Sequence, residues 1–334
     1  MGLNFDNFPC FQQIFAIFNI TLYSVILSIF LQDDFLNEVI AQYCPNLKKL
    51  TLKQPHDYGR NVKRLTEEGF VSFFENTLAK DKIGSLDIMD IPTKKDICSV
   101  GIRSLLYLSK LPKVENLSIN YVQLKSCEAF RNTGIFGANK ILKQIKNLYI
   151  YLGFQAVVSD VFSNTDWLFP EVINLKIDHN TRFLNTVKLP HWEESVKSLE
   201  CKIVNPEELR HVFNTFLSLE TLRISRFPNS KYLFMEIEKF SPRNLKSITF
   251  LHIDCSGNSF NNFKDIDYWI SKFPEEIHFK LIVKNLVCEN LLTKFIISEC
   301  KRSNVSIEVN YSVYSRYSPF NNKHDSDYES DNYD

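Results

Sequence analysis

Short segments in which apolar and polar residues alternate recur along the chain, and they share one pattern. Most have an apolar residue, two mostly polar residues, a central apolar residue that is usually Leu, one residue of any kind, and a second apolar residue; the last two copies are weaker and open on Glu276 and Asn304. In a β-strand, alternate side chains point to opposite faces, so this pattern predicts a short strand with one apolar face. Ten copies occur, and their central apolar residues stand at positions 50, 86, 117, 148, 175, 199, 222, 248, 279 and 307.

The spacing of the copies predicts how the strands are assembled. Consecutive central residues are 23 to 36 residues apart. One strand with one apolar face cannot bury that face alone, so each repeat needs a neighbour on either side. This pattern is typical of leucine-rich repeats. It predicts an α/β leucine-rich-repeat solenoid (a horseshoe) with a parallel inner sheet, outer helices and a short helical cap at the N-terminus.

The segments between the strands predict helices that return the chain to the start of the next strand. The clearest begins at Asn205, a capping residue, followed by Pro206 at the first helical position and by acids in the first turn. Apolar residues at helical spacing predict further helices at 62–79, 96–108, 125–145, 265–273 and 290–300. A doubly wound α/β fold also alternates strands and helices, but it does not repeat one phrase at every strand.

Three segments follow from this organisation. Residues 1–40 are expected to form a helical N-terminal cap, residues 41–312 the repeat solenoid, and residues 313–334 a disordered acidic tail. The tail ends in closely spaced acids interleaved with Ser and Tyr, at Asp325, Asp327, Glu329, Asp331 and Asp334. Such a composition does not supply enough apolar surface to order the segment on its own.

Composition narrows the expected function. Lys plus Arg and Asp plus Glu number 39 each, and this balance argues against a surface dedicated to nucleic acid. The eight cysteines are scattered and the histidines form no metal-binding pairs, so no metal, cofactor or disulfide framework is expected. No catalytic motif appears. We expect a protein without catalysis of its own, in the reducing environment of the cytoplasm or nucleus.

The N-terminal segment has two interpretations that remain open at this point. Residues 14–31 run for eighteen residues without a charge, which is the lower limit for a membrane span. However, no Lys or Arg precedes Lys48, and several polar side chains interrupt the apolar run. The other interpretation is a small helical cap that seals the first repeat.

The stretch from Phe8 to Leu31 also resembles a degenerate F-box, the three-helix module that docks onto the Skp adaptor of cullin ubiquitin ligases. Phe8-Pro9 stands where that family begins with Leu-Pro, and Leu22–Val25 resembles the opening of its second helix. The family's later Val-Cys/Asn-Arg-x-Trp segment is missing, with residues 29–32 in its place. The resemblance implies adaptor contacts at Phe8, Pro9, Ile14, Phe15, Phe18, Leu22 and Val25.

The outward-facing strand residues form the expected binding surface. In a horseshoe they line the concave face, where solenoid proteins commonly bind partners. Aromatic residues and Arg are enriched among residues that dominate binding energy. The candidate partner-binding residues are Lys49, Asp87, Asn116, Asn120, Tyr149, Tyr151, Lys176, Asp178, Glu200 and Arg223. Thr51 is expected on the same face.

The leading expectation is a substrate-recognition subunit of a cullin-type ubiquitin ligase, with a protein target on the concave face and possibly the Skp adaptor and cullin as partners. The alternatives are a repeat scaffold outside any ligase and a repeat protein anchored in a membrane by residues 14–31.

Overall fold

One parallel β-sheet runs through the chain. The computed structural model describes residues 13, 22–27, 33–52, 66–88, 107–120, 142–151, 165–180, 184, 188–225, 231–254, 275–284 and 304–310. Within these residues, eleven strands pair in the order of the sequence, every pair parallel. They are β1 (Ser24–Leu27), β2 (Lys49–Leu52), β3 (Ser85–Ile88), β4 (Asn116–Asn120), β5 (Asn147–Tyr151), β6 (Asn174–Asn180), β7 (Ser198–Lys202), β8 (Thr221–Ile224), β9 (Ser247–Asp254), β10 (His278–Lys284) and β11 (Val305–Asn310).

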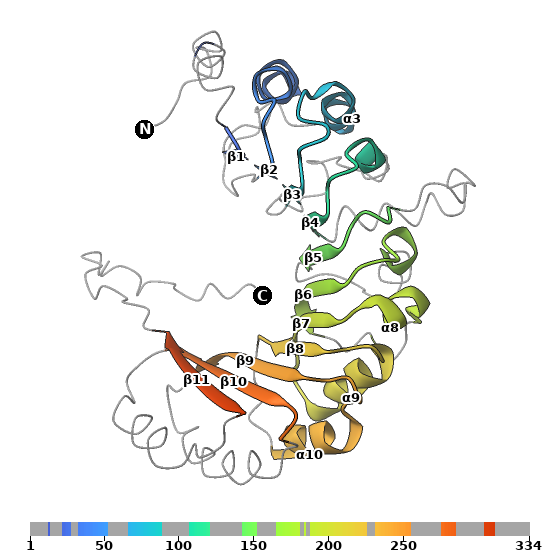
Figure 1. The fold of residues 1–334 in the computed structure, drawn as a ribbon, viewed down its shortest axis with the longest axis vertical. Coiled ribbons are helices and arrows are strands. Elements are labelled where there is room, and N and C mark those ends of the chain that lie inside the picture. Colours follow the sequence, from blue (N-terminus) through green and yellow to red (C-terminus); the bar gives the residue numbers. More distant parts are fainter. Residues whose placement is uncertain are drawn as a thin grey trace, which may run out of the picture.

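The strands follow one another along an arc, with helices on its outer side (Figure 1). A doubly wound fold reverses its strand order at one point of the sheet. The sequential order here excludes that alternative and confirms the α/β architecture with a parallel inner sheet.

The pairing register follows the repeated sequence pattern. Leu50 is paired with Leu86, and the same row continues through the next central residues to Phe279. The last predicted copy is wrong by two residues: Phe279 is paired with Val305, and Ile307 with Leu281. Both Val305 and Ile307 are apolar residues of one alternating strand, so the pattern alone did not distinguish the two registers.

Three apolar rows fill the space behind the sheet. Both core-facing positions of each strand from β2 to β8 are 2% exposed or less, as at Leu148 and Ile150. The third row is the apolar residue that opens the first eight copies, three residues before the central one. Its members are Leu47, Ile83, Val114, Ile145, Val172, Val196, Leu219 and Leu245, all at most 5% exposed. Burial of this apolar surface is the main force that holds successive repeats together.

A backbone hydrogen-bond ladder crosses the repeats just before the strands begin. The carbonyl oxygen of Tyr23 accepts from the N–H groups of both Lys48 and Lys49, and the carbonyl of Lys48 accepts from those of Gly84 and Ser85. The same two-donor arrangement recurs at each step as far as Ser247, and His278 donates to the carbonyl of Lys246. The ladder shows that the turns before the strands also stack in register.

Strand β1 was not predicted from the sequence, and its presence corrects two expectations. Ser24–Leu27 is a strand paired with Lys49–Leu52, so the helix predicted to open at Leu22–Val25 is wrong. Val25 lies opposite Leu50 and is 7% exposed, because it extends the apolar row of the sheet by one repeat. The sheet therefore reaches into the segment 1–40 that was predicted to be a separate cap.

The same strand bears on the predicted membrane segment. Residues 24–27 lie in the middle of residues 14–31, and they are extended and hydrogen-bonded to β2. A single helix over 14–31 is therefore not what the structure has. No helix within the described residues combines the length and apolar character that a membrane crossing requires.

Two of the predicted helices are confirmed. Helix α3 (Glu67–Asn76) lies within the predicted 62–79, and α9 (Pro206–Thr215) begins at Pro206, after the Asn205 cap. Residues 142–146 form a turn and not the end of a helix, and residues 108–110 form the short 3-10 helix η3 (Leu108–Lys110). The helices predicted at 265–273 and 290–300, like the tail 313–334, lie outside the described residues.

Several further helices among the described residues were not indicated by sequence periodicity, although the first lies within residues 1–40, which were predicted to be helical. They are η2 (Phe35–Ile40) with the single turn α2 (Ala41–Tyr43), then α8 (Pro190–Ser195) and α10 (Lys231–Phe240). Helix α8 begins where the carboxylate of Asp166, itself 2% exposed, accepts the backbone N–H of Trp192 at 2.7 Å. Its capping residue is thus supplied from a distant part of the sequence, which local spacing does not reveal.

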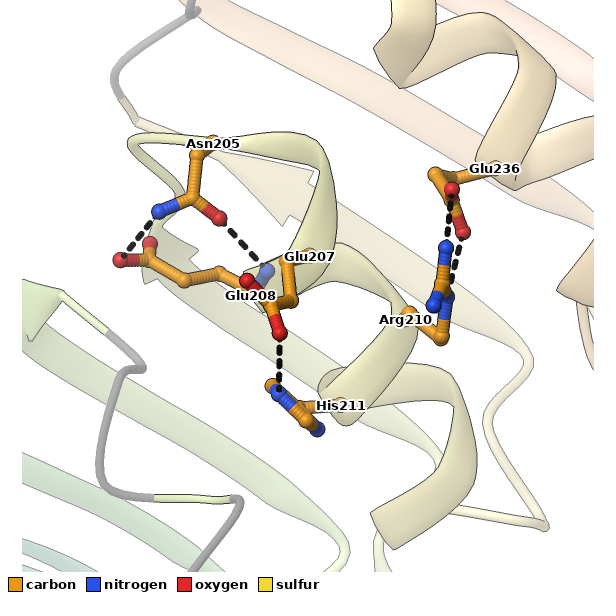
Figure 2. A network of polar contacts seen from close by, with 6 residues as sticks. All are labelled: Asn205, Glu207, Glu208, Arg210, His211 and Glu236. Carbon is orange, nitrogen blue, oxygen red and sulfur yellow. Dashed lines mark hydrogen bonds and ion pairs between the residues drawn. The ribbon is translucent and has the colours of Figure 1, made fainter.

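Polar contacts fix α9 and join it to α10 (Figure 2). The Asn205 side chain accepts the N–H of Glu208 at 2.9 Å, and the Glu208 carboxylate accepts the N–H of Val204 at 2.8 Å. Between the two helices, the Arg210 guanidinium donates to both carboxylate oxygens of Glu236, at 2.8 and 2.6 Å. Capping of this kind satisfies backbone donors that a helix leaves unpaired at its start.

Candidate functional site

The inner face of the sheet consists of the strand side chains that point away from the core. Because the strands are in register, these side chains form rows across the sheet. The first row holds Lys49, Ser85, Asn116, Asn147, Asn174, Ser198 and Thr221. The second row holds Thr51, Asp87, Ser118, Tyr149, Lys176, Glu200 and Arg223. Nearly all of these residues are polar or charged.

In the first row, three asparagines form a ladder of side-chain hydrogen bonds. The Asn147 amide donates to the Asn116 side-chain oxygen at 2.7 Å, and the Asn174 amide donates to that of Asn147 at 2.5 Å. The Asn116 amide donates in turn to the Gly84 carbonyl at 3.0 Å. Each amide group is therefore oriented by its neighbour. The ladder as a whole presents a fixed pattern of hydrogen-bond donors and acceptors to the inner side of the arc.

In the second row, an aromatic ring and alternating charges contact one another across four strands. The Lys176 ammonium lies 4.6 Å from the centroid of the Tyr149 ring and 2.8 Å from a Glu200 carboxylate oxygen. The Arg223 guanidinium approaches the other oxygen of Glu200 at 3.5 Å. We call Tyr149, Tyr151, Lys176, Asp178, Glu200, Lys202 and Arg223 the inner-face cluster. Its members come from β5, β6, β7 and β8.

The remaining members of the cluster extend it toward the ends of the strands. Lys202 and Asp178 pair at 2.5 Å, one strand apart. The pKa of the Tyr149 phenol is raised to about 12, chiefly by burial and to a lesser extent by the negative charges of Asp178 and Glu200. Tyr149 is thus a neutral hydrogen-bonding group at ordinary pH, held between charged neighbours.

The structure brings together six of the ten predicted partner-binding residues. Tyr149, Tyr151, Lys176, Asp178, Glu200 and Arg223 all belong to the inner-face cluster. Asp87 and Asn116 lie on the neighbouring strands β3 and β4 of the same face, and Lys49 lies on β2. The side chain of Asn120 is outside what the structure describes.

Thr51 lies on the inner face, as expected, but it is buried there. It is only 3% exposed, and its hydroxyl has no hydrogen-bond partner within the described part of the chain. Strand alternation placed it on the inner face, whereas burial depends on neighbouring side chains that alternation does not describe.

Of the seven residues implied by the F-box resemblance, only Leu22 and Val25 are described. Leu22 is partly buried against the core, and Val25 is a core residue of β1. A side chain in that position offers almost no surface to a protein adaptor. Phe8, Pro9, Ile14, Phe15 and Phe18 lie outside the described residues, so their predicted contacts stay a prediction.

Two described cysteines are structural. Cys201 occupies a core-facing position of β7, as predicted, and is completely buried. Burial raises the pKa of its thiol above the ordinary range, and burial also raises that of Cys44 to about 11. A thiol that stays protonated at neutral pH is a poor nucleophile and a poor metal ligand.

The sequence pattern could have indicated one further inner-face pair. Lys280 on β10 and Glu308 on β11 pair at 2.5 Å, and both continue the polar positions of the repeated phrase. They were not selected because the two last copies of the phrase are the weakest.

Comparison of the chain with models of known protein families and with curated proteins finds no match.

Proposed function

We propose that the chain is a leucine-rich-repeat solenoid whose inner face binds a protein partner, and that it acts by binding and not by catalysis. The observation that carries this proposal is the inner-face cluster, which places two tyrosines and an arginine among paired charges on four adjacent strands. Residues of these types contribute most to binding energy at protein interfaces.

The geometry of the sheet supports the same proposal. Eleven strands in sequential order make the inner face long and continuous. The charges on it are largely paired with one another, as Lys176 and Arg223 are with Glu200. A partner would therefore meet a pre-organised surface whose side chains need little further ordering on binding, which lowers the entropic cost of association.

An affinity comparison tests the proposal. The wild-type chain, the inner-face variant Tyr151→Ala/Arg223→Ala and the outer-helix control Glu207→Ala/Met235→Ala are used as baits, and the captured proteins are quantified. Glu207 and Met235 are exposed side chains of α9 and α10. We expect at least one protein that the wild type and the control retain and the inner-face variant loses.

The same variants then quantify the effect with that protein in purified form. Removal of two residues that dominate an interface weakens binding by about tenfold or more. If the inner-face variant and the outer-helix control lower the affinity equally, the partner binds elsewhere and the proposal fails. Unchanged thermal unfolding of both variants excludes a loss of fold as the cause.

The narrower role of a ligase substrate receptor rests on the resemblance of residues 8–18 alone. A pulldown with the Skp adaptor tests it, and the variant Phe15→Asp/Phe18→Asp is the suitable comparison. Deletion of the whole N-terminal segment would remove β1 and expose the core of β2. Binding by the wild type that the variant loses supports the role, and no binding by the wild type contradicts it.

A further inference from the structure

A second surface lies at the edge of the sheet where the strands begin. The turns before β2, β3, β4 and β5 stack on one another, as their backbone hydrogen bonds show: the Lys48 carbonyl accepts from Gly84, and the Gly84 carbonyl from Glu115. We call the basic residues of these turns the lysine edge. They lie within the six residues before each strand and are Lys48, Lys80, Lys82, Lys110, Lys113, Lys143 and Lys146.

The lysine edge carries a strong excess of positive charge. Its seven lysines face two acids in the same stretches, Asp81 and Glu115, which leaves a net charge of +5 (7 − 2). The equivalent turns before β6, β7, β8 and β9 are different. The six residues before each of these strands hold three basic residues and four acids, for a net charge of −1 (3 − 4): Lys197, Arg243, Lys246, Glu171, Glu193, Glu194 and Glu220. The positive charge is thus confined to one half of the edge.

Several lysines of this edge have no counter-charge within the described residues. Lys146 pairs with Glu171, and the ammonium of Lys82 donates to the Asn46 side chain at 2.5 Å. No such contact with a described residue is made by Lys110, Lys113 or Lys143, which are all exposed. Uncompensated like charges at neighbouring positions repel one another, so an anionic segment bound across them would relieve that repulsion.

The chain itself carries a segment of matching charge. The last ten residues hold five acids and no Lys or Arg. Residues 1–323 therefore have 39 basic and 34 acidic residues, a net charge of +5, which the terminal segment balances to zero. We propose that residues 325–334 bind to the lysine edge of the same chain, in particular to Lys110, Lys113 and Lys143.

The length of the connecting segment permits this contact. Neighbouring strands are about 4.8 Å apart, so β5 and β4 lie about 29 and 34 Å along the sheet from β11. Asn310 ends β11, whereas the lysine edge lies where the strands begin, so the six residues of the strand add about 20 Å at right angles and the direct distance is about 35–39 Å. The fourteen residues between Asn310 and Asp325 span at most about 46–50 Å when extended. A tethered segment has an effective concentration in the millimolar range, so a modest electrostatic affinity suffices for occupancy.

Zero-length cross-linking tests the proposal on the full chain. A carbodiimide joins a carboxylate to an amine only where the two are in contact, and mass spectrometry identifies the joined residues. We expect links from Asp325, Asp327 or Glu329 to Lys110, Lys113 or Lys143, with a yield that falls at high salt because exposed charges are screened. Links of the tail spread evenly over lysines elsewhere on the chain would overturn the proposal.

Isotope mixing distinguishes a contact within one chain from a contact between two chains. When chains containing nitrogen-14 and nitrogen-15 are mixed before cross-linking, an intramolecular contact gives links within one isotope only. Links that join the two isotopes in statistical proportion show that the tail of a second copy is the occupant, and they contradict the assignment to the same chain.

A binding measurement gives an independent readout with matched controls. A labelled peptide of residues 324–334 is titrated against the wild type and against a chain whose five tail acids are replaced by Asn or Gln. We expect the peptide to bind the neutralised chain about tenfold more tightly than the wild type, since the tethered tail competes. Equal affinity for both chains contradicts the proposal.

The site is then located by substitution in the neutralised chain. Lys110→Gln/Lys113→Gln/Lys143→Gln should abolish peptide binding, whereas Lys188→Gln/Lys239→Gln/Arg243→Gln, which removes the same charge from the other half of the chain, should retain it. Equal loss in both triple variants would show that net charge alone holds the peptide, and the proposed site would be wrong.

Discussion

Asp33 and Thr66 join the first outer helix to the second across a separation of 33 residues. One oxygen of the Asp33 carboxylate accepts the Thr66 N–H at 2.8 Å, and the other accepts its hydroxyl at 2.6 Å. The Thr66 hydroxyl oxygen also accepts the N–H of Gly69, as the cap of α3. A Cβ atom on Gly69 would lie 1.9 Å from the Asp33 carboxylate oxygen, so the glycine makes room for this junction.

The first prediction follows from that contact. Gly69→Ala should lower the free energy of unfolding by about 1–3 kcal/mol, because the added methyl group displaces Asp33 from both of its hydrogen bonds. In an Asp33→Ala background the same change should be neutral or stabilising by up to about 1 kcal/mol, because Ala favours a helix more than Gly does. Denaturant unfolding of the four chains measures both values. A loss of the same size in both backgrounds would contradict the proposed clash.

The second prediction concerns the buried hydroxyl of Thr51. Thr51→Val keeps the shape of the side chain and removes a polar atom that has no hydrogen-bond partner within the described residues. A buried unsatisfied group costs about 1–3 kcal/mol, so the variant should be more stable by about 1 kcal/mol. Thr221→Val, on the same face but half-buried, is the control and should change stability by less than about 0.5 kcal/mol. A destabilised Thr51→Val chain would show that the hydroxyl has a partner.

The third prediction is the titration of Tyr149. The difference in absorbance at 295 nm between the wild type and Tyr149→Phe should report a phenol with a pKa of about 12. Because this pKa lies above the ordinary value of 10.0, the folded chain keeps the proton more firmly than the unfolded chain. The resulting stabilisation is complete below pH 10 and is lost as the pH rises through about 12.

Removal of a nearby charge tests the cause of that shift. Asp178→Asn should lower the pKa of Tyr149 only in part, since burial contributes more than the carboxylates do. Asp81→Asn, an exposed acid in the turn before β3, serves as the control and should leave the titration unchanged. A return of the pKa to 10 in Asp178→Asn would show that charge, and not burial, dominates.

The fourth prediction tests the burial of Val25 and the exposure of Ile26 in strand β1. Val25→Ala should destabilise the chain by about 1.5–3 kcal/mol, because its side chain is 7% exposed within the core. Ile26→Ala should have little effect, because Ile26 is 63% exposed on the opposite face of the strand. Thermal or denaturant unfolding of both variants checks the alternation. Equal losses at the two positions would contradict the strand.

Much of the fold could be predicted because the central apolar residues report directly on the strand period. Leu117, Leu148, Leu175 and Leu222 are on one sheet and buried, as the pattern indicates. The first strand was missed because Ser24–Leu27 lies in a long uncharged run, where apolar residues on both sides hide the alternation. Short apolar runs of this kind fit a strand and a helix equally well.

The candidate site was predictable as a set of positions, but its internal contacts were not. Alternation placed Tyr149, Lys176 and Glu200 on one face. The repeated pattern aligns these positions across the strands, but which side chains touch depends on their rotamers, and the pattern does not specify those. The asparagine ladder has the same origin: Asn116, Asn147 and Asn174 share a position in their repeats, and stacking brings their amides within hydrogen-bond distance.

The backbone hydrogen-bond ladder from Tyr23 to His278 repeats the same contacts at each step, so the geometry of the sheet does not fix the number of repeats. A barrel must close and so admits only certain numbers of strands, whereas an arc built from identical steps can gain or lose a step without a gap. Excision of residues 175–198 would let Leu199 take the place of Leu175 beside Leu148, with each carbonyl of the ladder again facing two donors. Duplication or loss of whole repeats is thus the easiest way for such a chain to change the length of its inner face.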